Sequence, residues 1–129
     1  MSDTTSPHIL VIDDDDLLRR SLVESMKKAG YTVEDAKNGK DGLELALAHH
    51  PKLIFLDYQM PAPNGVEILT ELRKDEWGQG VEVVFATNVY DMAVVNAVLA
   101  MGVHDYILKA DSSLEQIVDV AKKYVSPKS

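Results

Sequence analysis

The sequence predicts one α/β domain in which helices cover both faces of a parallel five-stranded sheet. Three observations support this fold class. Five short apolar runs alternate with five longer runs of helical period. Three of the short runs are nearly continuously apolar, as expected of strands that helices bury on both faces. The length of 129 residues suits one compact domain and excludes two full ones.

The strands are predicted where β-branched and aromatic residues gather in short runs. The first, third and fourth are almost continuously apolar, so we expect them at the centre of the sheet. Because crossovers between parallel strands are right-handed, five such strands favour the doubly wound order 2-1-3-4-5. The expected strands are His8 to Ile12, Tyr31 to Ala36, Leu53 to Leu56, Val81 to Ala86 and Asp105 to Leu108.

Capping residues predict where the first four helices begin and end. Asp15 or Asp16 caps a first helix that extends to Ala29, and Gly30 ends it in the left-handed conformation. The middle helices are expected at Lys40 to His49, Gly65 to Lys74 and Tyr90 to Met101, the last of them terminated by Gly102.

The last helix is predicted from a capping box and a regular apolar pattern. Ser112 and Glu115 have the spacing of the box, and the apolar residues from Leu114 to Val125 follow steps of three and four. We expect residues 1–129 to form a single domain with a flexible N-terminus over 1–7. Residues 126–129 are expected to be a tail or the start of a linker.

The charge balance excludes several classes of function. Lys and Arg total 13 and Asp and Glu total 21, which gives a formal charge of −8. A surface of this sign repels phosphate backbones, so direct nucleic acid binding is not expected. The absence of cysteine excludes disulfides and thiolate metal sites. No apolar stretch has the length of a membrane span and no secretory signal is visible, so we expect a cytoplasmic protein without a membrane contact.

Aspartates follow two of the predicted central strands. Asp13 and Asp14 come directly after the first strand and Asp57 directly after the third. In the order 2-1-3-4-5 these two strands flank the switch point, where ligands of open α/β sheets bind. Carboxylates about 5 Å apart repel by roughly 3 kcal/mol per pair at an effective dielectric near 20, so the group needs a cation or protons. Oxygen ligands in an incomplete cage favour Mg²⁺. Asp15 and Asp16 are interpreted as helix-capping acids instead.

Two further predicted strands end in groups of other chemistry. Thr87 follows the fourth strand with a hydroxyl, and Lys109 follows the fifth with a cation. Taken singly, each has an ordinary structural explanation. At the same edge of the sheet, the lone aspartate offers a carboxylate nucleophile and the acidic pair offers a metal site. Thr87 and Lys109 add two groups for the transferred oxygens. This combination indicates phosphoryl transfer.

These motifs together resemble the receiver domain of response regulators, in particular the CheY-like single-domain receivers of two-component systems. The resemblance covers essentially all 129 residues and implies a flavodoxin-like fold. The motifs that carry it are Val11 to Asp14, Asp57 to Pro61 followed by Gly65, Thr87, and Tyr106 to Lys109.

The resemblance implies a role for each residue of the site. Asp57 is the phospho-acceptor, and it takes the phosphoryl group from a histidine kinase or a histidine phosphotransfer protein. Asp14, Asp57 and the backbone carbonyl of Gln59 bind Mg²⁺, and Asp13 acts on the metal through water. Lys109 pairs with Asp57 and then with the phosphoryl group. The chain is therefore expected to be a phosphoprotein that catalyses only its own phosphorylation and dephosphorylation.

The resemblance also implies a conformational switch. Thr87 hydrogen-bonds a phosphoryl oxygen, and Tyr106 then turns inward beside the fourth helix. The face formed by the fourth helix, the fifth strand and the fifth helix changes and is read by a downstream protein. Couplings of about 1 to 3 kcal/mol are enough for such switches.

Four positions modulate or depart from the family pattern. Ala110 follows Lys109 where the family usually has proline after a cis peptide bond; because a cis bond to a non-proline residue costs about 2.5 to 4 kcal/mol, we expect a trans or rearranged loop. Asn88 stands where alanine or glycine is usual, and we expect it to change phosphoryl lifetime or donor choice. Gln59 and Val89 lie at positions that modulate the hydrolytic water in the family.

The fourth predicted helix has no clear polar face, since every residue from Met92 to Met101 except Asn96 is apolar. Either this helix is deeply buried, or its outer side pairs two copies of the chain in a homodimer.

Two alternatives to a phospho-accepting receiver are open at this point. The changes at Ala110 and Asn88 suggest a degenerate receiver that binds partners without phosphorylation. Asp13-x-Asp15 after an apolar strand also resembles the nucleophile motif of haloacid-dehalogenase phosphatases, although a chain of 129 residues leaves no room for a cap domain.

Overall fold

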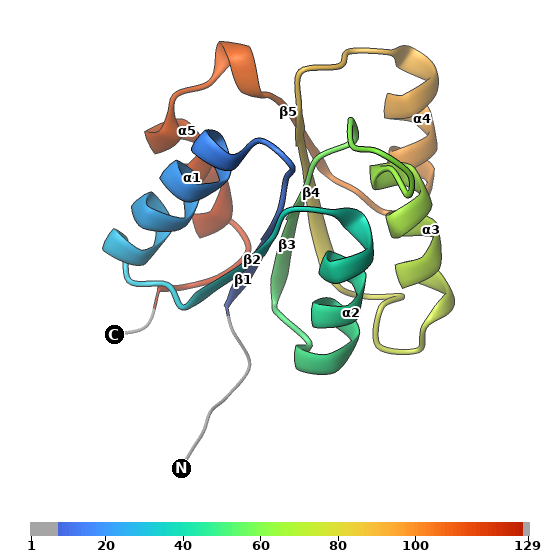
Figure 1. Cartoon of the computed structure of the whole chain (residues 1–129), viewed down its shortest axis with the longest axis horizontal. Helices are drawn as coiled ribbons and strands as arrows, with labels where there is room; N and C mark the ends of the chain where they lie inside the picture. Colours follow the sequence, from blue (N-terminus) through green and yellow to red (C-terminus); the bar gives the residue numbers. More distant parts are fainter. Residues whose placement is uncertain (1–7, 128–129) are drawn as a thin grey trace.

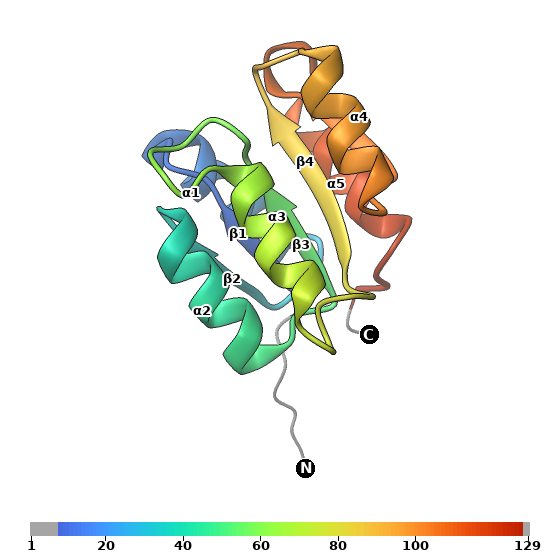
Figure 2. The ribbon, with the colours of Figure 1, turned by 90° about the vertical axis from the view of Figure 1, so that its right-hand side faces the viewer.

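Five parallel strands form one sheet of order β2-β1-β3-β4-β5 in the computed structural model, which describes residues 8–127. The predicted order and the central position of the first, third and fourth strands are confirmed. Figure 2 shows β1, β3 and β4 side by side behind the helices of one face. The strands are β1 (Ile9–Ile12), β2 (Val33–Ala36), β3 (Leu53–Leu56), β4 (Glu82–Thr87) and β5 (Asp105–Leu108).

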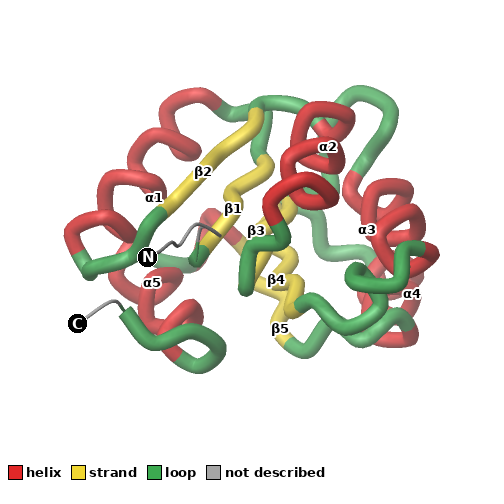
Figure 3. Tube along the Cα trace, turned by 90° about the horizontal axis from the view of Figure 1, so that it is seen from below, coloured by secondary structure: helices red, strands yellow, loops and turns green. Residues whose placement is uncertain are grey.

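The helices form one layer on each face of the sheet. Figure 1 shows α1 and α5 on one side and α2, α3 and α4 on the other, and the view in Figure 3 shows the sheet between the two layers. The helices are α1 (Asp16–Lys28), α2 (Gly39–His49), α3 (Gly65–Lys74), α4 (Met92–Ala100) and α5 (Leu114–Lys122), with a short 3₁₀ helix, η1 (Lys109–Asp111), between β5 and α5.

Each face of the sheet has its own apolar core, because successive side chains of a strand point to opposite faces. On β1, Ile9 and Val11 pack toward α1 and α5, whereas Leu10 and Ile12 pack toward α2, α3 and α4. All four are at most 1% exposed. The sheet is therefore held from both sides, and its carboxyl edge is a rigid base for the loops that follow the strands.

Several predicted element ends are wrong by one or two residues. The strand predicted over Tyr31 to Ala36 begins at Val33, and β4 extends to Thr87. The fourth helix begins at Met92 rather than Tyr90, because the Asp91 side chain accepts a hydrogen bond from the Ala93 N–H and caps it.

The capping box of the last helix also differs from the prediction. Ser113 and Gln116 form it, rather than Ser112 and Glu115. The Ser113 hydroxyl accepts from the Gln116 N–H at 3.1 Å, and the Gln116 side chain accepts from the Ser113 N–H at 2.8 Å. Two consecutive serines are each followed three residues later by Glu or Gln, so the pattern alone allows either register.

The two predicted ends of the chain are only partly covered by the structure. The expected flexible segment 1–7 and the last two residues of the expected tail, 128–129, lie outside the described residues. Within residues 8–127, no helix is long and apolar enough to cross a membrane.

Candidate functional site

Three carboxylates meet at the carboxyl edge of the sheet. Asp13 follows β1 and Asp57 follows β3, and these two strands are neighbours whose last residues, Ile12 and Leu56, are paired in register. Single ligand oxygens of Asp13, Asp14 and Asp57 all lie within 4.8 Å of one another. Asp13 is 2% exposed and Asp57 is 4% exposed, whereas Asp14 is exposed. The cluster therefore has a buried floor and one carboxylate open to solvent.

Lys109 provides the positive charge inside this cluster. Its Nζ donates to Asp13 Oδ2 at 2.9 Å and to Asp57 Oδ2 at 3.2 Å, and its side chain is only 7% exposed. The Lys109–Ala110 peptide bond is trans, since the cis bond among the described residues is Ala62–Pro63. Lys109 thus reaches Asp57 without the cis bond, and its shorter contact is to Asp13.

Burial and charge act in opposite directions on the two partners of this ion pair. Burial would lower the pKa of Lys109, but its hydrogen bond to Asp13 and the negative charges of Asp13 and Asp57 raise that pKa above its ordinary value. Burial raises the pKa of Asp13, against the hydrogen bonds that Asp13 accepts from the Asp15 N–H and from Lys109. The lysine therefore stays charged at neutral pH, and burial disfavours the ionised form of Asp13.

Arg19 holds the acidic loop in place, a role that was not predicted from the sequence. Its Nη1 donates to the backbone carbonyl of Asp13 at 2.8 Å, and its Nη2 and Nε donate to Asp16 and Asp35, both also at 2.8 Å. Arg19 is 7% exposed. A signal was present in the sequence: Arg19, Leu22 and Met26 share one helical stripe, and all three are the buried residues of α1.

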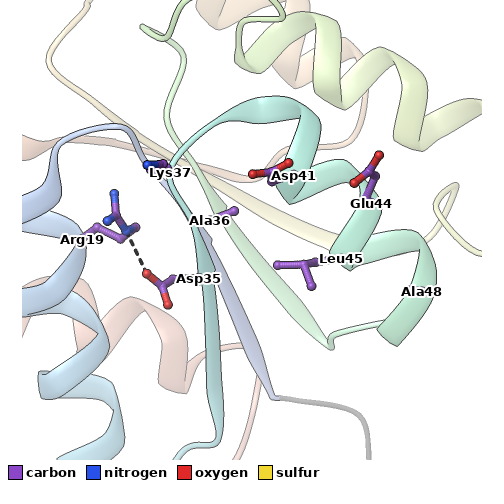
Figure 4. Close-up of a pocket in the computed structure, with 8 residues that line it drawn as sticks. All are labelled: Arg19, Asp35, Ala36, Lys37, Asp41, Glu44, Leu45 and Ala48. Carbon is purple, nitrogen blue, oxygen red and sulfur yellow. Dashed lines mark hydrogen bonds and ion pairs between the residues drawn. The ribbon is translucent and has the colours of Figure 1, made fainter.

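Asp16 is therefore more than a helix-capping acid. Asp15 is the N-cap, because its Oδ1 accepts from the Leu18 N–H at 3.1 Å. The hydrogen bond and charge of Arg19 lower the pKa of Asp16. Figure 4 shows the ion pair between Arg19 and Asp35 at one end of a pocket that extends to α2. The residues that line this pocket do not include the three clustered carboxylates.

The loop after β3 is held close to Asp57 by a glycine and a backbone hydrogen bond. The Gln59 N–H donates to Asp57 Oδ1 at 3.2 Å, and the Gly65 N–H donates to the carbonyl of Tyr58 at 3.0 Å. A Cβ at Gly65 would lie 2.4 Å from the carbonyl oxygen of Asp57. Only glycine allows this approach, so Gly65 fixes the path of the loop that positions the carboxylate.

The predicted switch residues lie on β4 and β5 beside the cluster. Thr87 is fully buried at the end of β4, and its hydroxyl accepts from the Val89 N–H at 3.3 Å. Tyr106 is half-buried on β5, where its hydroxyl donates to the Val89 carbonyl at 2.5 Å. Its ring lies against Phe85 and meets the exposed Tyr90 edge to face. Burial raises the pKa of the Tyr106 hydroxyl.

The two residues that depart most from the receiver pattern contact each other. Asn88 Oδ1 accepts a hydrogen bond from the Ala110 N–H at 2.9 Å, and both residues are exposed. No sequence pattern links these two positions, because 22 residues separate them.

The structure contradicts one of the two alternatives drawn from the composition of α4, that of a deeply buried helix. Val94 and Val98 are buried, whereas Met92 is 53% exposed and Leu99 is 50% exposed. The helix is therefore not deeply buried, and part of its apolar surface faces outward.

The fold and the site together define a class of protein: a doubly wound α/β domain with a carboxylate cluster and a lysine at the switch point. A family model described as the response regulator receiver domain matches residues 9–122. The chain therefore belongs to the response regulator receiver family.

Curated relatives agree with this assignment. The chain is 36% identical over 107 residues to the "Probable transcriptional regulator ycf27" of Porphyridium aerugineum, a match that covers 83% of this chain and 43% of that protein. It is 34% identical over 101 residues to the "Response regulator ArlR" of Staphylococcus aureus, which covers 78% of this chain and 45% of that protein. The chain thus spans less than half the length of these relatives.

Solved structures agree with the fold. A DNA-binding response regulator of the LuxR family from Staphylococcus aureus superposes with a TM-score of 0.82 at 28% identity, over 94% of this chain and 98% of that chain. A CheY-like receiver domain protein from Methanospirillum hungatei gives a TM-score of 0.84 at 24% identity, over 92% and 93%. The predicted flavodoxin-like, CheY-like fold is confirmed.

Proposed function

We propose that the chain accepts a phosphoryl group on Asp57 from a histidine kinase or a histidine phosphotransfer protein, in a reaction that depends on Mg²⁺. One observation carries the proposal. Asp57 is buried within 4.8 Å of two further carboxylates and is also in contact with the ammonium group of Lys109. A nucleophile, a cation site and a positive charge for the transferred oxygens therefore occupy one place.

The donor set fits a divalent cation that prefers oxygen. When ionised, the three carboxylates carry three negative charges against the single positive charge of Lys109, and one divalent ion balances the surplus. Asp14 and Asp57 would hold Mg²⁺ directly with the backbone carbonyl of Gln59, and Asp13 through water. Once bound, the ion supplies charge stabilisation to the oxygens of the incoming phosphoryl group.

The covalent step requires a carboxylate rather than a carboxylic acid at Asp57. An oxygen of Asp57 attacks the phosphorus of a phosphohistidine, the P–N bond breaks, and its electron pair stays on the imidazole of the donor. The product is an acyl phosphate, which water later hydrolyses back to the carboxylate. Lys109 moves from the Asp57 carboxylate to the new phosphoryl oxygens and offsets their charge. The chain thus acts as a signalling receiver that catalyses only its own modification and its reversal.

The switch would begin at Thr87. Its hydroxyl, which accepts from the Val89 N–H, would turn to donate to a phosphoryl oxygen, because the acyl phosphate brings strong acceptors close to it. The loop after β4 then moves, and Tyr106, which holds that loop through the Val89 carbonyl, turns inward. The surface of α4, β5 and α5 changes, and a downstream protein reads it.

We also propose that two copies of the chain pair and that the protein acts in the cytoplasm. The apolar residues exposed on α4, including Leu99, support pairing of two copies through this helix. The formal charge of −8 opposes direct nucleic acid binding by this chain. A phosphoryl donor of the kinase type and a reaction that depends on Mg²⁺ would support a cytoplasmic location.

The test is the intact mass of the protein after incubation with Mg²⁺ and acetyl phosphate, for the wild type and Asp57→Asn. A single phosphoryl adduct that forms in the wild type alone and disappears when EDTA removes the metal supports the proposal. The mimic beryllofluoride should bind the wild type under the same conditions. If neither adduct nor mimic binding occurs, the chain is a receiver that works without phosphorylation. Continuous turnover of a generic phosphate ester would instead indicate a phosphatase.

A further inference from the structure

Two loops at the carboxyl edge of the sheet are joined by one side chain. Asn88 follows Thr87 in the loop after β4, and Ala110 follows Lys109 in the segment after β5. The Asn88 side-chain oxygen accepts the Ala110 N–H at 2.9 Å. The hydrogen bond therefore lies one residue away from the hydroxyl and the ammonium group that serve the proposed reaction.

The bond extends the sheet beyond its last backbone pair. Thr87 and Leu108 are the final partners in the register of β4 and β5. Beyond this pair the backbone pairing of the two strands stops, because residues Lys109–Asp111 form the 3₁₀ helix η1. The side chain of Asn88 makes a hydrogen bond where the backbone hydrogen bonds of the sheet have ended. Asn88 lies one residue beyond β4, and Ala110 lies two residues beyond β5.

The start of η1 needs such an acceptor. The first N–H groups of a helix have no partner within it, and the N-cap residue, Leu108, gives no side-chain hydrogen bond. Asn88 supplies the acceptor for Ala110 from a different loop. A proline at position 110 would have no N–H to donate, so this contact requires a residue other than proline there.

We propose that Asn88 is a positioning residue for Lys109. By holding the Ala110 N–H, it fixes the first turn of η1 and thus the backbone from which Lys109 extends to Asp13 and Asp57. It acts through the lysine and does not touch the reacting atoms. The inference rests on the proposed function, since the lysine matters chemically only if Asp57 takes up a phosphoryl group.

The first readout is the amide exchange rate of Ala110, measured by NMR in the full chain without a phosphodonor. Asn88→Ala should speed exchange of the Ala110 N–H, because the described structure gives this group no other acceptor. Asn88→Asp keeps an oxygen at the same place and should preserve the protection. Equally fast exchange in the wild type and Asn88→Ala would overturn the inference, as would loss of protection in Asn88→Asp.

The second readout is the rate constant of adduct formation with acetyl phosphate and Mg²⁺. Asn88→Ala should lower the maximal rate constant by roughly three- to tenfold, the factor that loss of one ordinary hydrogen bond gives, and leave the half-saturating acetyl phosphate concentration unchanged. Gln79→Ala removes an exposed amide from the loop before β4, at the opposite edge of the sheet. This control should behave like the wild type.

Ala110→Pro separates action through Lys109 from direct action on the phosphoryl group. It removes the donor, so adding Asn88→Ala to it should change the rate constant no further. A full additional loss in the double variant would overturn the inference, because Asn88 would then act independently of Ala110. A wild type that forms no adduct contradicts the proposed function and this inference with it. A wild-type adduct with unchanged kinetics in Asn88→Ala contradicts the inference alone.

Discussion

Arg19 donates a hydrogen bond from its guanidinium group to the backbone carbonyl of Asp13 at 2.8 Å, inside the protein. The contact connects α1 to the loop that carries the clustered carboxylates. Asp35, at the carboxyl end of β2, binds the same guanidinium group, so three segments of the chain meet on one side chain. The acidic loop is thus held by a buried cation as well as by its own turn.

Arg19→Met should destabilise the protein by about 1 to 3 kcal/mol, since it leaves the Asp13 carbonyl buried without its donor. Urea unfolding followed by circular dichroism measures the change. Arg20→Met is the matched control, because Arg20 is the adjacent, exposed arginine of the same helix, and it should change stability by less than about 0.5 kcal/mol. Equal effects of the two variants would contradict the structural role given to Arg19.

Gly65→Ala should destabilise the protein by about 1 to 3 kcal/mol, because the added methyl group must displace the backbone of Asp57. Gly80→Ala is the matched control: a Cβ there has nothing within 4 Å. This control should be neutral or should raise stability by up to about 1 kcal/mol, because alanine reduces the conformational entropy of the unfolded chain. Thermal unfolding of both variants measures these changes in stability. A neutral Gly65→Ala would contradict the close packing of Gly65 against the Asp57 backbone.

Asp105 connects β5 to α5 and should make stability depend on pH. Burial would raise its pKa, but hydrogen bonds from the Tyr124 hydroxyl and Lys123 outweigh burial and lower it below 3.8. A lowered pKa stabilises the fold above the unfolded-state value, and this contribution is lost as the pH falls through the folded-state value. Asp105→Asn should therefore reduce stability at neutral pH and have a smaller effect at pH values well below 3.8.

The control for this pH effect is Asp119→Asn, which removes an exposed carboxylate from α5. It should show a much smaller pH dependence. Tyr124→Phe should cost about 1 kcal/mol at neutral pH in the wild type and clearly less in Asp105→Asn. If the stability lost in Asp105→Asn is the same at neutral and at acidic pH, the lowered pKa of Asp105 would be contradicted.

Under the proposed function, added Mg²⁺ should stabilise the wild type against urea, because the ion would bind the folded cluster and not the unfolded chain. At about 100 times its dissociation constant the gain should be about 2.7 kcal/mol. Asp14→Asn and Asp57→Asn should reduce this gain, whereas Glu24→Gln, which neutralises an exposed acid on α1, should retain it. If Mg²⁺ does not change the urea midpoint of the wild type, that result would argue against the metal site.

Leu99→Lys should weaken a homodimer formed through α4, because it places a charge on the exposed apolar surface of that helix. Light scattering over a range of concentrations measures the change. Leu17→Lys, which alters an exposed leucine of α1, should leave the dimer intact. A wild type that stays monomeric at all concentrations would exclude this pairing.

The fold and most of the site geometry could be predicted because they follow from local pattern. Apolar runs such as Leu53–Leu56 specify buried parallel strands, and the acids directly after such runs must meet at the switch point. Helix ends were less certain, as in the choice between Ser112 and Ser113, because equivalent residues occur in adjacent registers.

Several contacts between distant segments could not be predicted. The burial of Arg19 depends on acceptors from β2 and from the loop after β1, and the Asn88–Ala110 hydrogen bond depends on how two loops leave the sheet. The preference of Lys109 for Asp13 is of the same kind, since its 2.9 Å contact joins residues 96 apart in sequence.

Tyr31 brings the two ends of the described chain together. Its hydroxyl donates to the Val125 carbonyl at 2.7 Å, and its ring meets the His8 ring edge to face. Figure 1 shows both ends on the side of the molecule opposite the loops that carry the site. Tags, surface anchors or fluorophores fused at either end should therefore leave the candidate site accessible. A peptide that joins the two ends should also yield a circular permutant with new termini in an exposed loop.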